Sequence, residues 1–93
     1  MTAVEETIVG VCEPGFGAVA DAFATNLTDR GDLGARVCVI HDGKVVVDQW
    51  GGWADRARTQ PWAEDTLTNM WSSTKGVVAL AAQMLVDRGQ LDV

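Results

Sequence analysis

Residues 72–88 read SSTKGVVALAAQMLVDR, and this stretch decides the fold. Positions 77–82 are apolar on every side of a helix, and a helix without a polar face is usually a buried one. Gly89 follows the basic residue Arg88, which is a typical end of a helix. We therefore predict a buried helix that begins at Ser72 and runs to about Arg88.

A second helix is predicted nearer the start of the chain. Between Phe16 and Arg30 the apolar residues recur at steps of three and four, which indicates a helix with one apolar face. Gly31 follows a basic last turn and ends it. The apolar stripe consists of Phe16, Val19, Ala20, Phe23, Ala24 and Leu27.

A hairpin lies between the two helices. Residues 35–40 and 45–50 are rich in β-branched side chains and flank Asp42-Gly43, a typical two-residue hairpin turn. In the return strand, alternation puts Val45, Val47 and Gln49 on one face and Val46, Asp48 and Trp50 on the other. Residues 7–11 fit a short strand or an extended arm, and residues 55–65 fit a surface loop. These elements indicate the α+β class.

One amphipathic helix and one hairpin cannot cover every side of the helix over 72–88. We therefore expect most of the fold to lie outside these 93 residues, or to be supplied by another copy or fragment.

Composition excludes some functions. The formal net charge is −6 with scattered basic residues, which argues against nucleic acid. The spacing of Cys12 and Cys38 matches neither zinc sites nor redox motifs, so we expect free thiols in a reducing cytosol. The first six residues resemble no secretory signal, and the apolar run over 76–82 is too short to cross a bilayer. A cytoplasmic protein without a membrane partner is expected.

Ser72 and Lys75 form an S-x-x-K motif at the predicted start of the buried helix. Residues three apart share a helix face, which holds the lysine amine beside the serine hydroxyl. A serine hydroxyl becomes a good nucleophile when a neighbour takes its proton, and a lysine can do so when it is neutral. Burial or nearby cations favour the neutral amine. The helix start favours a developing anion, and the Ser72 N–H is a candidate oxyanion donor.

A simpler interpretation is a serine that caps the helix, with a solvated lysine in the first turn. A lone S-x-x-K is a weak motif. The chain holds only two serines and two lysines, however, which makes a chance match less frequent. Ser73 could act as the cap under either interpretation, and its own i+3 residue, Gly76, cannot act as a base.

The surrounding sequence resembles the class C β-lactamase-related serine hydrolases. This group includes class C β-lactamases, D-Ala-D-Ala carboxypeptidases and the β-lactamase-like (family VIII) carboxylesterases. The resemblance is carried by WGGWAD at 50–55, PW at 61–62, DTL at 65–67, MWSSTK at 70–75 and LVDRGQLD at 85–92. It spans essentially the whole chain, and the order of elements agrees.

The resemblance implies a β-lactamase/penicillin-binding-protein-like fold, of which residues 1–93 would be the N-terminal part of a single domain. It makes Ser72 the acylated nucleophile and Lys75 its general base. Substrates would be small-molecule esters, amides or β-lactams. Because no secretory signal is recognised, peptidoglycan is the less accessible substrate, which favours a cytoplasmic carboxylesterase. The family's Tyr-x-Asn motif cannot be placed, since the chain has no tyrosine, and neither can its late K-T-G-like strand. Trp50-Gly51-Gly52 precedes the nucleophile and is interpreted as structural.

Other interpretations remain open. A noncatalytic relative could keep the fold and only bind its ligand. Residues 15–20 match G-x-G-x-x-A before a helix, as in dinucleotide sites, but the following strand turns straight into a hairpin. His41 is interpreted as a turn residue, and the four tryptophans as packing or loop anchors, with Trp71 a possible lining of an acyl pocket. No acidic cluster has metal-ligand spacing, and we expect neither metal nor cofactor.

Overall fold

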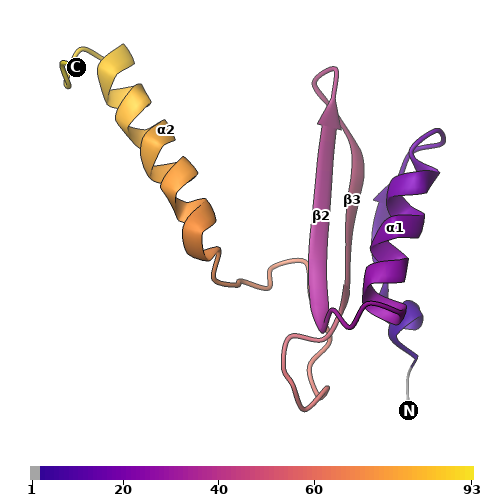
Figure 1. Cartoon of the computed structure of the whole chain (residues 1–93). Coiled ribbons are helices and arrows are strands. Elements are labelled where there is room, and N and C mark those ends of the chain that lie inside the picture. Colours follow the sequence, from indigo (N-terminus) through magenta and orange to yellow (C-terminus); the bar gives the residue numbers. More distant parts are fainter. Residues whose placement is uncertain (1–2) are drawn as a thin grey trace.

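The computed structural model describes residues 3–93 and divides into a sheet with one helix packed on it, and a second helix that stands apart (Figure 1). In chain order the elements are the 3-10 turn η1 (Val4–Thr7), β1 (Val9–Cys12), α1 (Gly17–Thr28), β2 (Gly34–His41), β3 (Lys44–Gly52), the 3-10 turn η2 (Trp71–Ser73) and α2 (Thr74–Asp87).

The sheet has the order β1-β3-β2, and β3 pairs antiparallel with both neighbours. The predicted hairpin is confirmed, with His41 opposite Lys44. Its turn residues Asp42 and Gly43 have φ values of 55° and 74°. Two positive φ values are what the tightest hairpin turns require, and Asp-Gly tolerates them. Of the two possibilities for residues 7–11, a short strand is the one observed, displaced to 9–12.

The core lies where α1 packs against the sheet. Phe23 and Leu27 of the predicted stripe are buried, together with Val46 and Val47 of β3, and Val47 is 0% exposed. The strict alternation predicted for the return strand is wrong at this point. Val39 pairs with Val47 but Ile40 pairs with Val45, so a bulge inserts an extra residue opposite β2. The bulge lets two consecutive valines enter the core.

The predicted helices have corrected ends. The helix expected over 16–30 spans Gly17–Thr28, and Gly31 follows with a φ of 82°. The helix expected from Ser72 begins as the α-helix α2 only at Thr74, because Ser72 lies in the 3-10 turn η2. At the other end Arg88 is the C-cap, and Gly89 has a φ of 73°. The predicted glycine end of this helix is confirmed.

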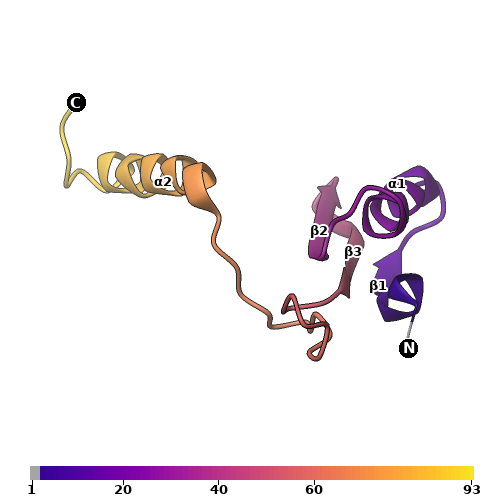
Figure 2. The ribbon, with the colours of Figure 1, turned by 60° about the horizontal axis from the view of Figure 1, so that its bottom comes forward.

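The prediction that the helix over 72–88 is buried does not hold within residues 3–93. The side chains of Val78 and Leu80 are both 62% exposed, and no residue of α2 is buried. Figure 2 shows the cause, since an extended connection carries α2 away from the sheet and nothing in the described part of the chain covers it. No helix among these residues is long and apolar enough to cross a membrane.

Gly52, at the end of β3, provides a test of this packing. Its φ is 78°, and a Cβ there would lie 2.3 Å from the Leu33 carbonyl oxygen, which accepts the Trp53 N–H at 2.8 Å. We expect Gly52→Ala to lower the free energy of unfolding of the full-length protein by about 1–3 kcal/mol, because backbone must shift. Urea denaturation measures it.

Gly17→Ala is the matched control. A Cβ at Gly17 meets nothing within 4 Å, and alanine suits a helix better than glycine. Equal stabilities for the two variants would contradict the close approach at Gly52.

Candidate active site

Ser72 and Lys75 lie one turn apart where the chain enters α2. Ser72 belongs to η2 and Lys75 to the first turn of α2, and both residues are exposed. Within residues 3–93 no hydrogen bond joins the Ser72 hydroxyl to the Lys75 amine. Ser73 occupies the N-cap position of α2, but its side chain makes no cap hydrogen bond. The helix-capping role weighed for these serines is therefore not observed.

The residue before Ser72 has an unusual backbone. Trp71 has a φ of 50°, and its side chain is 81% exposed. A bulky residue in the left-handed region is uncommon and carries strain. The Ser73 N–H donates to the Met70 carbonyl at 3.0 Å, which closes the turn around Trp71 and Ser72. A sharp turn therefore presents Ser72 at the end of the helix.

The loop expected over 55–65 is ordered by the Asp55 carboxylate. Its Oδ1 accepts the backbone N–H of Thr59 at 2.9 Å and that of Gln60 at 3.1 Å, and its Oδ2 accepts the Thr59 hydroxyl. The hydrogen bond from the Thr59 side chain is the main cause that lowers the pKa of Asp55 below its ordinary value, and the Gln60 N–H adds to it.

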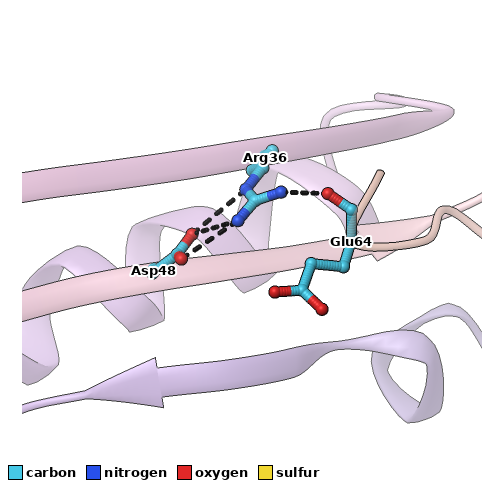
Figure 3. Close-up of polar contacts among 3 residues, drawn as sticks. All are labelled: Arg36, Asp48 and Glu64. Carbon is cyan, nitrogen blue, oxygen red and sulfur yellow. Dashed lines mark hydrogen bonds and ion pairs between the residues drawn. The ribbon is translucent and has the colours of Figure 1, made fainter. Parts of the chain in front are cut away.

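The same loop is fastened to the sheet by backbone and by Arg36. The Trp62 N–H donates to the Gly52 carbonyl at 2.9 Å, and Trp53 pairs with Pro61. Arg36 of β2 donates to the Glu64 carbonyl and forms an ion pair with Asp48 at 2.9 Å (Figure 3). Arg36 could not be selected from the sequence alone, because its contact with Glu64 joins residues 28 positions apart.

The remaining candidates lie away from Ser72. His41 ends β2, with its ring 6.0 Å from that of Phe16, and Cys12 and Cys38 are free thiols. Within residues 3–93 no three histidine, cysteine or acidic side chains cluster as metal ligands would.

The dinucleotide interpretation requires two neighbouring parallel strands joined by a helix. β1, before the glycines at 15 and 17, pairs with β3 in the antiparallel sense, and β3 separates it from β2. The arrangement is not a dinucleotide-binding βαβ unit. We therefore set this alternative aside.

Comparison with known proteins identifies the family. A family model described as Beta-lactamase matches residues 19–93. The chain belongs to the β-lactamase family. Among curated relatives, this β-lactamase-family chain is 41% identical over 85 residues to "Esterase/beta-lactamase LipL" of Mycobacterium tuberculosis (strain ATCC 25618 / H37Rv), covering 91% of the chain and 20% of that protein. It is also 41% identical over 69 residues to "Esterase EstB" of Burkholderia gladioli, covering 74% of the chain and 18% of that protein.

Solved structures confirm the fold. A family VIII carboxylesterase is similar with a TM-score of 0.86 and 46% identity, over 91% of the chain and 23% of that structure. A penicillin-binding protein homolog from Caulobacter crescentus gives 0.82 and 50% identity, over 90% and 23%. The α+β, β-lactamase/penicillin-binding-protein-like fold is thus shown. Since these scores cover nearly the whole chain, the separated placement of the sheet and α2 is shared with both proteins.

The hydrogen bonds to Asp55 predict how its contribution to stability changes with pH. Because the folded pKa of Asp55 is lowered, its stabilising contribution is present above the ordinary aspartate pKa of about 3.9 and is lost as pH falls through the lowered value. We expect Thr59→Val to raise the pKa of Asp55, because the largest cause of the shift is removed. An NMR titration of the Asp55 carboxyl carbon measures this.

Thr59→Ser keeps a hydroxyl at the same position and serves as the control. In Thr59→Ser the pKa of Asp55 should stay close to its wild-type value. If the pKa of Asp55 is unchanged in Thr59→Val as well, the side-chain hydrogen bond does not set it.

Proposed function

We propose that the full-length protein is a serine hydrolase that forms an acyl-enzyme on Ser72, with Lys75 as general base. The observation that carries the proposal is an S-x-x-K motif at the entrance to α2 in a chain of the β-lactamase family. The chain spans only 20% of its esterase/β-lactamase relative and 23% of the solved carboxylesterase. We accordingly propose that residues 1–93 form the N-terminal part of a single β-lactamase-like domain.

The proposed reaction has two halves. Ser72 Oγ attacks the carbonyl carbon of the substrate, and its proton passes to the neutral amine of Lys75. The tetrahedral intermediate collapses, and the leaving group departs with that proton. Water then attacks the acyl carbon with general-base assistance, and the acid leaves as the Ser72 hydroxyl is restored. The Ser72 N–H, at the positive end of α2, is the proposed donor to the oxyanion.

The Lys75 amine is neutral more readily where water is excluded, and the apolar surface of α2 favours such an environment. Positions 77–82 of α2 are apolar around the helix, yet Val78 and Leu80 are exposed within residues 3–93. Apolar surface of this extent is normally covered in a soluble protein. We propose that the cover of α2 also shields Lys75, which favours its neutral form.

Esters are the proposed substrates, with amides and β-lactams as alternatives. Both curated relatives are named esterases, one of them also a β-lactamase, and one solved neighbour is a carboxylesterase. One shallow depression of about 410 Å³ is lined by Leu67, Thr68 and Asn69, just before the motif.

A noncatalytic binding protein of the same fold is the second candidate. It is favoured by the exposure of both Ser72 and Lys75 and by the absence of a hydrogen bond between them within residues 3–93. A binding protein would take up the ligand without forming a covalent bond to Ser72.

Covalent labelling separates the two candidates. The full-length protein, treated with a fluorophosphonate or a penicillin and digested, should carry the adduct on Ser72 by mass spectrometry. We expect Ser72→Ala to lower ester hydrolysis by at least about a thousandfold, and Lys75→Ala by about 10²–10⁴-fold, because both act in the same proton transfer.

The chain supplies its own matched controls. Its other serine is Ser73 and its other lysine is Lys44, which forms an ion pair with Glu13 at 3.1 Å on the surface. Ser73→Ala and Lys44→Ala should hydrolyse esters nearly as the wild type does. A folded wild-type protein that leaves Ser72 unlabelled would overturn the proposal in favour of the binding protein.

A further inference from the structure

Arg36 holds together three segments of the chain (Figure 3). Its Nε donates to Asp48 Oδ1 at 3.1 Å, and its Nη2 donates to Oδ1 at 2.9 Å and to Oδ2 at 3.0 Å. The guanidinium carbon lies 4.7 Å from the ring centroid of Trp50. The remaining nitrogen, Nη1, donates to the backbone carbonyl of Glu64.

The sheet fixes the direction of this guanidinium. Trp50 is the Cα partner of Arg36, and Asp48 lies two residues earlier on the same face of β3. A forked ion pair and an aromatic contact together leave the planar group little freedom. The direction of the Nη1 N–H is therefore fixed, and the Glu64 carbonyl is its acceptor. Since the side chains of Arg36 and Asp48 remain 32% and 27% exposed, their pairing adds little to overall stability.

Within residues 3–93, the Glu64 contact is the last hydrogen bond to the sheet before Ser72. The other hydrogen bonds of residues 63–73 join near neighbours. The Thr66 N–H donates to the Ala63 carbonyl at 3.2 Å, the Ala63 N–H to Thr66 Oγ1 at 2.8 Å, and the Ser73 N–H to the Met70 carbonyl. We call residues 63–70 the approach segment. Within the described part of the chain, Arg36 fixes the point where this segment leaves the sheet, eight positions before Ser72.

We propose that Arg36 is a positioning residue for acyl transfer: by anchoring the approach segment through the Glu64 carbonyl, it sets the place of Ser72 relative to the sheet. The inference rests on the proposed function. Arg36 touches neither substrate nor Ser72, so its effect passes through the backbone.

The chemistry of the contact requires arginine. The three donors of a lysine ammonium sit on one nitrogen, so lysine cannot form the planar fork to Asp48, stack on Trp50 and reach Glu64 at the same time. Arg36→Lys should therefore restore only part of what Arg36→Ala loses, and Asp48→Asn should weaken the fork. Arg56, an exposed arginine of the loop over 55–65 without a side-chain hydrogen bond within residues 3–93, provides the control as Arg56→Ala.

Two readouts test the proposal in the full-length protein. Hydrogen exchange reports on the amides of Trp62, Ala63 and Thr66, which are hydrogen-bonded next to Glu64. Stopped-flow acylation by a p-nitrophenyl ester, divided by the number of active sites titrated in the burst, reports on the positioning of Ser72. In Arg36→Ala we expect faster exchange and an acylation rate per active site lowered by about tenfold or more, since small misplacements are costly.

The outcomes separate the two levels of the proposal. Unchanged exchange in Arg36→Ala overturns the anchoring role. Faster exchange with an unchanged rate per active site leaves Arg36 as a local stabiliser and overturns the positioning role. If Arg56→Ala lowers the acylation rate per active site as much as Arg36→Ala does, the positioning role is overturned as well. If wild-type Ser72 is not acylated, the proposed function fails, and with it the catalytic role of Arg36, while the exchange data still decide the anchoring.

Discussion

Ser72 can pass its proton to Lys75 only if the chain holds both side chains on one side as it enters α2. The 3-10 turn at Trp71–Ser73 bears directly on this requirement. In a 3-10 helix, with about 3.0 residues per turn, side chains three apart lie nearly one above the other, whereas in an α-helix they are offset. Ser72 lies in this turn and Lys75 in the first turn of α2, and the left-handed backbone of Trp71 stands at the start of the turn.

The sheet and α2 have different parts in the proposed site. β3 is the central strand, and the bulge at Val46 seats two valines beneath α1, which makes this layer the rigid frame. The proposed pair lies in η2 (Ser72) and in the first turn of α2 (Lys75), and no residue of α2 is buried within residues 3–93. The connection between them is therefore important, and the contacts of Asp55 and Arg36 are the ones that order it. The two solved structures are similar over about nine tenths of the chain, so the arrangement of the sheet and α2 is common to all three proteins.

Features encoded by neighbouring residues could be predicted from the sequence. The Asp42-Gly43 turn fixes the hairpin locally, and the stripe that contains Phe23 and Leu27 marks α1. The bulge at Val46 could not be foreseen, because three consecutive valines fit either face of a strand. The contact of Arg36 with Glu64 depends on how the loop folds back, and no spacing rule connects such distant residues. Apolar residues on every side of positions 77–82 predict burial of the helix, but this pattern does not say which residues supply the cover.

A crystal structure of the full-length protein after reaction with a fluorophosphonate tests the central claim most directly. We predict a covalent bond between phosphorus and Ser72 Oγ, with Lys75 Nζ within about 3.2 Å of that oxygen and shielded from solvent. An adduct on another residue, or a Lys75 amine that points into solvent away from Ser72, would contradict proton transfer between these two side chains.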